Sequence, residues 1–362
     1  MEGLGRLMFQ KDFFRGKRVF LTGHTGFKGS WMCELLLLCG AKVTGFALEP
    51  PTDPALFYLA GLDQRMDSIT GDVRDLSALE SAVETAQPEI VIHMAAQPIV
   101  RDSYANPVYT YETNVMGTVN VLEAVRRNGR VKSFLNVTTD KVYKNNEWEW
   151  GYREIDELNG FDPYSNSKSC SELVTDSYKQ SFFKGTKTAV STARAGNVIG
   201  GGDFANDRII PDCVRAATER KMILVRNPYS TRPYQHVLEP LYAYLTIVQA
   251  QYADQRAAGS YNIGPDDSDC VTTGELATIF CRTWGGVEWK NICEENAVHE
   301  ANFLKLDCSK AKTVLKITPR WNIQTAIEKT VEWVKHWQKR DNIIECMEKQ
   351  IMEYLQEDDA AK

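Results

Sequence analysis

The stretch Arg18-Val19-Phe20-Leu21-Thr22-Gly23-His24-Thr25-Gly26-Phe27-Lys28-Gly29 decides the fold of this chain. Its first five residues form a short β-rich run, which is typical of a strand, and the glycines that follow have the spacing GxxGxxG. The segment from Trp31 to Leu38 then predicts a helix. A strand, a glycine turn and a helix in this order are typical of the first unit of a parallel α/β sheet.

The glycine turn also predicts a binding site. Without a Cβ, glycine lets backbone N–H groups approach a pyrophosphate at the positive end of a helix. Such turns also occur in simple strand-to-helix connections, so the position directly after a strand is what favours binding. We predict that a dinucleotide cofactor binds here, at Gly23, His24, Gly26, Phe27 and Gly29.

Short β-rich runs alternate with longer helical segments along the rest of the first half of the chain. We predict a fold of the α/β class: a doubly wound, Rossmann-type parallel sheet with a smaller α/β substrate-binding lobe. Right-handed crossovers would place ligands at the carboxyl ends of the strands. The predicted strands are Arg18–Thr22, Lys42–Leu48, Ile90–Met94, Ser133–Thr138 and Thr188–Arg194, and the predicted helices are Trp31–Leu38, Leu76–Ala86, Tyr109–Arg127 and Ser165–Phe183.

The amino-acid composition of the chain changes after Arg194, where glycine, proline and aromatic residues become frequent. We therefore predict that residues 1–194 form the cofactor-binding domain and that residues 195–238 and 265–362 form the substrate-binding lobe. Residues 239–264 contain a helical segment and a strand-like end, so we expect them to return to the cofactor-binding domain.

Composition narrows the classes of function. The 362 residues carry a formal net charge of -6, which argues against a nucleic-acid partner. The nine cysteines are scattered without a CxxC pair, so we expect reduced thiols in the cytoplasm, with neither a metal site nor a disulfide framework. The apolar run Leu35 to Leu38 is too short for a membrane span or a signal sequence.

Tyr164 and Lys168 are the predicted catalytic pair, because they stand four residues apart on one helical face. For the phenol to act as a base near neutrality, its pKa must fall by about three units, which requires roughly 4 kcal/mol. A partly buried ammonium at ~4 Å supplies about that energy, and a solvent-exposed one does not. Thr139 ends a strand about twenty residues earlier and can contact the same substrate hydroxyl as Tyr164.

The residues after the second and third strands bear on the choice of cofactor. Glu49 comes slightly late for the acidic residue that usually holds the adenosine ribose, and no arginine nearby would accept a 2′-phosphate. The sequence therefore favours NAD over NADP. Asp72 can accept a hydrogen bond from the adenine amino group, and a role as a turn or N-cap residue is an equal alternative.

Taken together, these motifs resemble the nucleotide-sugar 4,6-dehydratases of the extended short-chain dehydrogenase/reductase superfamily, over nearly the whole chain. The resemblance implies NAD as cofactor and adds Val73, Ala95, Ala96 and Gln97 to the residues around it. The motifs Arg194–Asp203 and Arg232–Pro240, together with the lysine after Asp140, point to the cytidine branch, and hence to CDP-glucose as substrate. The motifs are the glycine turn, His93–Gln97, Asn114–Thr118, Thr139–Lys141, Tyr164–Lys168, Arg194–Asp203 and Arg232–Pro240.

The resemblance also implies a reaction sequence. Tyr164 takes the C4 hydroxyl proton while hydride passes from C4 to NAD; water then leaves across C5 and C6, with Asp140 as the acid, and hydride returns to C6. Most related dehydratases carry a glutamate where this chain has Lys141. Two roles stay open for Lys141: it is the C5 base within a coupled pair with Asp140, or it touches the cofactor or an enolate oxygen and leaves C5 to another base or to water.

The segments that resemble the family's substrate lobe supply candidate diphosphate contacts, because guanidinium groups bind phosphate bidentately. His236 and His299 are further candidates, and a buried structural histidine is at least an equal alternative for each. The resemblance also implies a homodimer or a dimer of dimers, paired through the helices at 109–127 and 165–183. A solvent-exposed surface residue is the alternative for each arginine, and Arg232 is the first choice. The diphosphate candidates are Asn197, Arg208, Arg215 and Arg232.

Three rival functions remain at this stage. A nucleotide-sugar 4-epimerase would use Tyr164 and Lys168 without needing an acid at Asp140. A 4,6-dehydratase could also act on another nucleotide hexose, because no residue is visibly committed to cytosine. A dinucleotide-sensing protein without catalysis is the remote alternative, since such proteins commonly lose the catalytic tyrosine or lysine.

Overall fold

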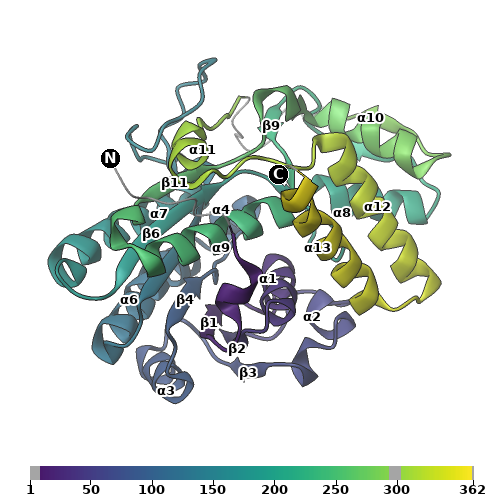
Figure 1. Ribbon diagram of the computed structural model, residues 1–362. Coiled ribbons are helices and arrows are strands. Elements are labelled where there is room, and N and C mark those ends of the chain that lie inside the picture. Colours follow the sequence, from purple (N-terminus) through teal and green to yellow (C-terminus); the bar gives the residue numbers. More distant parts are fainter. Residues whose placement is uncertain (1–8, 293–302, 361–362) are drawn as a thin grey trace.

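The structure is a computed structural model that describes residues 9–292 and 303–360. Its centre is a parallel seven-stranded sheet in the order β11-β6-β5-β4-β1-β2-β3, drawn in Figure 1. The order reverses between β1 and β4, as in a doubly wound fold, so the predicted fold class is confirmed. The strands are β1 (Arg18–Thr22), β2 (Lys42–Ala47), β3 (Asp67–Thr70), β4 (Ile90–His93), β5 (Ser133–Thr139), β6 (Ala189–Ala195) and β11 (Ser260–Ile263).

Helices cover both faces of the sheet because both faces are apolar. In β1, Val19 and Leu21 belong to the hydrophobic core on one face, while Phe20 belongs to the core on the other. This alternation is the two-residue period of a strand. The first face is covered by α1 (Phe27–Leu38) and α9 (Leu238–Ala253), with α13 (Ile343–Ala360) packed outside on α1, and the second by α3 (Leu76–Ala86), α6 (Gly117–Asn128) and α7 (Pro163–Tyr178).

The helix boundaries follow local capping. α7 begins two residues before its predicted start, because Asp162 accepts a hydrogen bond from the Ser165 backbone N–H and Pro163 occupies the first turn. α6 ends where Gly129 adopts a left-handed conformation. The predicted helix 109–127 is composed of α5 (Pro107–Tyr111), a π-helical turn η3 (Glu112–Met116) and α6.

A second group of elements packs around its own core beside the sheet. Figure 1 shows α12 and α13 next to α8 and α10, and the contacts among α8, α10, α12 and α13 agree. Residues 239–264 contain β11 and all of α9 except its first residue, Leu238. β11 pairs with β6 as the edge strand of the large sheet. The group contains α8 (Ile209–Thr218), α10 (Thr273–Trp284), α12 (Ile323–Lys339), β8 (Ile223–Val225) and β13 (Trp289–Asn291).

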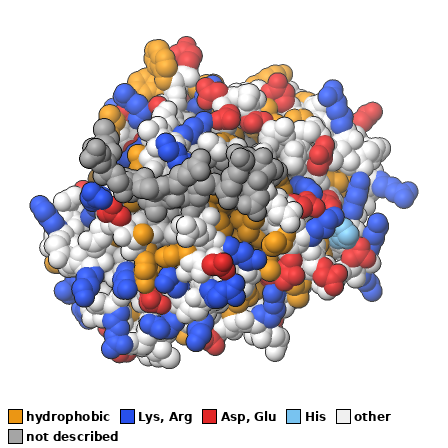
Figure 2. Space-filling model, viewed as in Figure 1, with side chains coloured by type: hydrophobic (Ala, Val, Ile, Leu, Met, Phe, Trp, Pro, Cys, Tyr) orange, Lys and Arg blue, Asp and Glu red, His pale blue; other side chains and the backbone are white. Residues whose placement is uncertain are grey.

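The remaining described elements are short. They are α2 (Leu56–Leu59), α4 (Val100–Ala105), α11 (Ser309–Leu315), β7 (Val198–Ile199), β9 (Thr231–Pro233), β10 (Gln235–His236), β12 (Cys270–Thr272) and the single-turn helices η1 (Lys11–Phe14), η2 (Leu62–Gln64), η4 (Asp140–Val142), η5 (Lys179–Phe183), η6 (Gln255–Ala257) and η7 (Asp267–Asp269). Among the described residues, none of these helices, long or short, has the length and apolarity to cross a bilayer. Figure 2 shows acidic and basic side chains interspersed on one face of the molecule.

Candidate active site

The glycine turn between β1 and α1 is built by close backbone approach. Gly23 has a φ of 78°, and a Cβ there would lie 2.7 Å from the backbone nitrogen of Ala95. A Cβ on Gly29 would overlap the backbone of Gly23 and His24. Gly26 differs, since the nearest atom to its Cβ position is the Gly23 carbonyl oxygen at 3.7 Å. Packing therefore requires Gly23 and Gly29, while Gly26 leaves open the approach to the first turn of α1.

The structure places the other predicted cofactor residues on both sides of this turn. His24 is buried, and its Nε2 lies 2.7 Å from the Ser68 hydroxyl, so its ring points into the sheet edge. Burial lowers the pKa of His24 to about 4. Because its ring is buried and hydrogen-bonded, His24 offers only its backbone to a ligand. The Phe27 ring lies against the position that a Cβ on Gly200 would occupy.

Asp72 and Val73 follow β3. The Asp72 carboxylate accepts hydrogen bonds from the Arg74 backbone N–H at 2.9 Å and from the Arg74 guanidinium at 2.7–3.1 Å. These bonds lower the pKa of Asp72. This geometry matches the turn alternative for Asp72, while Val73 packs in the hydrophobic core.

The loop after β4 carries Ala95, Ala96 and Gln97. Ala95 donates its backbone N–H to the Thr22 hydroxyl at 3.2 Å, which joins this loop to the end of β1. Gln97 is buried, and its side-chain amide donates to the Thr110 hydroxyl at 2.9 Å. The loop is thus fixed beside the glycine turn, with the Gln97 side chain engaged inside the protein.

The polar side chains at the end of β5 form a connected group. The Thr139 hydroxyl donates to Asp140 Oδ1 at 2.9 Å, and Lys141 Nζ donates to the same oxygen at 3.4 Å. Lys141 Nζ also donates to Asn197 Oδ1 at 3.3 Å. Asp140 is fully buried, and among the described residues its Oδ2 has no hydrogen-bond partner. A buried carboxyl oxygen with one open position is well suited to hold a proton that it later gives away.

Tyr164 and Lys168 reach the same place from the first two turns of α7. A hydrogen bond joins the Tyr164 phenol to the Thr139 hydroxyl, and Lys168 Nζ donates to the Val137 carbonyl of β5 at 3.3 Å. The structure therefore brings together Thr139, Asp140, Lys141, Tyr164 and Lys168 at the carboxyl end of β5.

The electrostatics differ from the sequence-based expectation. Burial raises the pKa of Tyr164 to about 12, although the Thr139 hydrogen bond lowers it. Burial also lowers the pKa of Lys168 to about 8. We expected the neighbouring ammonium to bring the phenol toward neutrality; instead burial dominates, and the influences that lower the Tyr164 pKa are the Thr139 hydrogen bond and the charge of Arg208. A further positive charge beside the phenol would favour its ionised form.

Sequence reasoning missed Lys28 and Tyr244. Lys28 stands inside the glycine turn, and its Nζ donates to the Tyr244 hydroxyl of α9 at 3.4 Å. Burial, together with the charges of Lys168 and Arg208, lowers the pKa of Lys28 to about 7. These couplings place its ammonium near the catalytic group. The available signal was a lysine within a glycine-rich turn, where a buried cation is unusual.

The candidate substrate residues lie on several elements. Arg208 forms an ion pair with Asp203 at 2.9 Å, and its charge lowers the pKa values of both Lys28 and Tyr164, so it faces the site. Arg215 pairs with Asp212 on α8. Arg232 is a buried residue of β9 and donates to the Thr231 carbonyl at 3.0 Å. Asn197 joins the catalytic group through Lys141.

His236 occupies an aromatic enclosure. Its ring centroid lies 4.9 Å from that of Trp321 and 6.0 Å from that of Trp31, and the residue has no exposed surface. Burial lowers its pKa to about 3. These contacts match the structural alternative for His236. His299 lies outside the described residues.

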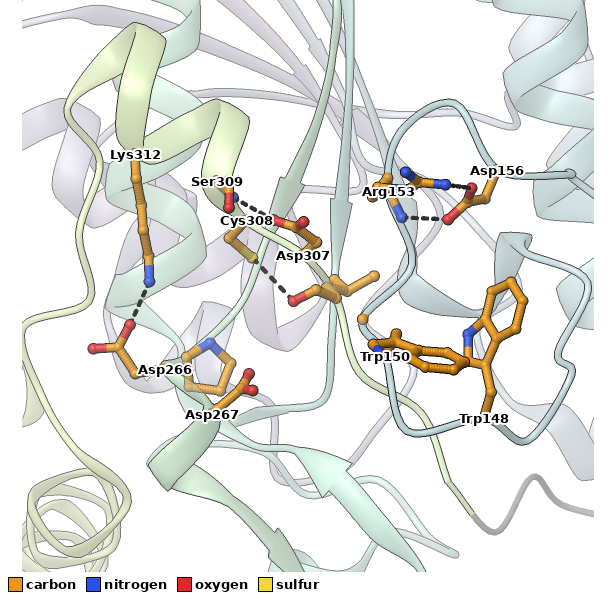
Figure 3. Close-up of a pocket in the computed structure, with 13 residues that line it drawn as sticks. Trp148, Trp150, Arg153, Asp156, Asp266, Asp267, Asp307, Cys308, Ser309 and Lys312 are labelled. Atoms are coloured by element: carbon orange, nitrogen blue, oxygen red, sulfur yellow. Dashed lines mark hydrogen bonds and ion pairs between the residues drawn. The ribbon is translucent and has the colours of Figure 1, made fainter.

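A cavity of about 620 Å³ is lined in part by residues 265–267, which follow β11. Figure 3 draws the side chains around it. The Trp148 and Trp150 indoles line one side, and Asp266 and Lys312 face each other across an ion pair on the other. None of the five residues grouped at the end of β5 lines it. Trp148 stacks on Tyr152 with ring centroids 5.4 Å apart, so this aromatic cluster packs the loop that follows β5 and η4.

Comparisons with known proteins agree on the family of this arrangement. Residues 20–330 match the family described as GDP-mannose 4,6 dehydratase. A CDP-glucose 4,6-dehydratase of Salmonella typhimurium is 46% identical over 354 residues, which cover 96% of this chain and 99% of that protein.

Solved structures share the fold. A dTDP-glucose 4,6-dehydratase of Bacillus anthracis in complex with NAD superposes with a TM-score of 0.75 at 20% identity, covering 91% of this chain and 100% of that one. A UDP-glucose 4-epimerase of Stenotrophomonas maltophila with bound NAD gives a TM-score of 0.78 at 19% identity, covering 90% and 99%. Because dehydratases and epimerases superpose equally well, the fold does not separate the two activities.

Proposed function

Because the chain belongs to the GDP-mannose 4,6 dehydratase family of nucleotide-sugar dehydratases, we propose that it is an NAD-dependent hydro-lyase that converts CDP-glucose to CDP-4-keto-6-deoxy-glucose. The observation that carries the proposal is the buried Asp140 carboxyl hydrogen-bonded to Thr139, which also contacts Tyr164. An epimerase needs the tyrosine and the lysine but no acid for a departing hydroxyl. The 46% identity to a CDP-glucose 4,6-dehydratase over 96% of the chain supports the choice of nucleotide.

The residues of the glycine turn fit a dinucleotide. Gly26 leaves the first turn of α1 open to a pyrophosphate, and Glu49, two residues after β2, offers a carboxylate to a ribose hydroxyl. Tyr164 and Lys168 would hold the nicotinamide end. NAD, when bound, supplies the acceptor and then the donor of the hydride.

The chain's own residues would move the protons. Tyr164 would take the C4 hydroxyl proton, with Thr139 orienting that hydroxyl, and Lys168 with the positive nicotinamide ring would offset the burial that raises the Tyr164 pKa to about 12. Asp140 would give a proton to the departing C6 hydroxyl. Lys141 bonds to both Asp140 and Asn197, so it would hold the acid in place whichever of its two proposed roles it has at C5.

We propose that the substrate nucleotide is held by residues 195–238 and 265–362, with 1–194 and 239–264 as the NAD-binding domain. Arg208 is the favoured diphosphate contact, because its charge already acts on Lys28 and Tyr164. Arg232, the first choice from the sequence, is buried in β9 and donates to the Thr231 carbonyl, and Arg215 pairs with Asp212, so we keep both as secondary candidates. Arg208 also pairs with Asp203, so a diphosphate would share its guanidinium with that carboxylate.

We also propose a homodimer in the cytoplasm. Exposed apolar side chains gather on α4, α5, η3, α7 and η5, and pairing these helices across a two-fold axis would bury them. The free thiols of the described cysteines are compatible with a reducing compartment. Sedimentation of the purified chain tests the dimer, and a monomer at micromolar concentration would contradict it. The side chains are those of Tyr104, Val108, Tyr109, Met116, Leu173 and Phe182.

The test of function is incubation with CDP-glucose in D₂O, with dTDP-, UDP- and GDP-glucose in parallel. We expect a 4-keto-6-deoxy product that carries deuterium at C5, and the fastest turnover with CDP-glucose. Asp140→Asn should still oxidise C4 but should not lose water. A CDP-hexose that differs from the substrate only in C4 configuration would instead establish an epimerase.

A further inference from the structure

A buried carboxylate stands one turn after the catalytic lysine. Glu172 of α7 accepts hydrogen bonds from the Thr138 hydroxyl of β5 at 2.5 Å, from the Thr192 hydroxyl of β6 at 2.8 Å and from Arg194 Nη2 of β6 at 2.9 Å. All three donors come from the strands beneath the helix. One side chain therefore ties α7 to both β5 and β6.

The Glu172–Arg194 ion pair is closed off from water. The two side chains are 2% and 3% exposed, respectively, and the other guanidinium arm donates to the Tyr143 hydroxyl at 2.8 Å and to the Glu154 carbonyl at 3.1 Å. Replacing such a pair by well-packed apolar residues is often neutral or stabilising, so stability is a weak explanation for it. The location of Glu172 one helical turn after Lys168 suggests a functional explanation instead.

Lys168 and Glu172 are held by consecutive residues of β5. Lys168 Nζ donates to the Val137 carbonyl at 3.3 Å, and Glu172 accepts from the side chain of Thr138. We propose that Glu172 is a positioning residue for the reaction proposed above: it fixes α7 on β5 and β6 and keeps Lys168 in the ammonium form. The inference rests on the proposed function, because it gives a role to the electrostatics of that same site.

The charges around Lys168 support this role. Burial lowers the pKa of Lys168, and Glu172 is the neighbour whose charge raises it. From the other elements, the groups that feel the Lys168 charge are Lys28 of α1 and His93 of β4, whose pKa values it lowers. Neither offers a negative charge. The other charged and titratable groups of this region include Asp140, Lys141, Tyr143, Tyr164, Arg194 and Arg208.

The test measures kcat as a function of pH with saturating CDP-glucose and NAD. It follows the alkaline limb of this profile, where the rate falls as pH rises. Glu172→Gln keeps the size and polarity of the side chain and removes the charge. If the ammonium is required, a lower Lys168 pKa makes the rate fall at lower pH, and we expect the limb to move down by roughly one pH unit. Thr175→Val is the matched control, since it breaks the buried bond from Asn136 Nδ2 to the Thr175 hydroxyl on α7 without changing charge.

Removing one partner of a buried ion pair can prevent folding. The double variant Glu172→Gln/Arg194→Gln leaves no unpaired charge and still removes the carboxylate, so its limb should also move down. Thermal unfolding establishes that each variant is folded. A limb that coincides with that of the wild type in a folded variant would overturn the inference. Wild-type inactivity with every nucleotide sugar would contradict the proposed function itself, so the two failures are distinguishable.

Discussion

The Tyr164 phenol is the residue on which the proposed chemistry depends most directly. Tyr164→Phe should lower kcat by about 10²- to 10⁴-fold, the usual contribution of a positioned base, with little change in the unfolding temperature. Tyr111→Phe is a matched control, because that phenol also contacts α7, through Asn166 at 3.0 Å, but lies away from the end of β5. Steady-state kinetics measures both, and full activity in Tyr164→Phe would refute the assignment.

Lys141 decides how the C5 proton is removed. Its ammonium bonds to Asp140 Oδ1 at 3.4 Å and to Asn197 Oδ1 at 3.3 Å, which favours a charged lysine that orients the acid. Lys141→Met should then slow the loss of water while exchange of the C5 hydrogen with D₂O continues. Proton NMR of the oxidised sugar follows that exchange. Loss of exchange together with turnover would instead identify Lys141 as the C5 base.

At the scale of single elements, the glycine turn gives a prediction with its own control. Gly29→Ala places a methyl group on the backbone of Gly23 and His24, so the turn must open, and we expect a loss of about 2 kcal/mol or more of stability. Gly26→Ala meets nothing closer than 3.7 Å and has a φ of -80°, so it should fold normally.

The same Gly26→Ala variant tests where the cofactor approaches. A methyl group on the open side of the turn should weaken NAD binding by roughly tenfold or more, a cost of about 1.4 kcal/mol or more. Calorimetric titration of NAD measures the change in affinity, and thermal unfolding measures the change in stability. Applied to both variants, the two measurements separate weaker cofactor binding from a destabilised turn. NAD affinity equal to that of the wild type in Gly26→Ala would place the pyrophosphate elsewhere.

The elements that could be predicted from the sequence are those with a strong local signal. β1 and α3 have the predicted bounds, because an apolar run before glycine and an Asp75 cap before Leu76 mark them. The π-helical turn η3 could not be predicted, since nothing in Glu112–Met116 departs from ordinary helical composition. The same limit applies to β9 and β12, whose three-residue pairing depends on contacts distant in sequence.

The catalytic group was predictable for a different reason. Tyr164 and Lys168 are fixed by helical spacing, and Thr139 by the end of a strand, so sequence alone brought them together. The pKa of Tyr164 was not predictable, because desolvation depends on everything packed around the phenol, including Tyr244 from α9. Lys28 and Glu172 could not be found from the sequence, because their roles depend on contacts with residues far along the chain: Tyr244 is 216 positions from Lys28, and Thr138 is 34 positions from Glu172.

On the scale of the whole molecule, Glu239 joins α9, which packs on the sheet, to α13 and to the segment before α12. Its carboxylate accepts from the Tyr354 hydroxyl of α13 at 2.8 Å and from the backbone N–H groups of Arg320 and Trp321 at 3.0 and 2.7 Å. Burial nevertheless raises its pKa from the ordinary value of 4.5 to about 7. The folded protein therefore binds this proton more tightly than the unfolded chain does.

The pH dependence of stability follows from that difference. The contribution of protonated Glu239 is fully present below about pH 4.5 and is lost as pH rises to about 7, which amounts to roughly 3 kcal/mol. Glu239→Gln is neutral at every pH, so its unfolding temperature relative to the wild type should rise between pH 5 and pH 7.5. Calorimetry of both proteins across that range measures the difference between their unfolding temperatures. The contributions of the other titrating groups cancel in this difference. If the unfolding temperature of Glu239→Gln relative to the wild type falls as pH rises, the three donors hold Glu239 ionised despite its burial. The contacts of Glu239 with α13 and with the segment before α12 would then be strongest at neutral pH.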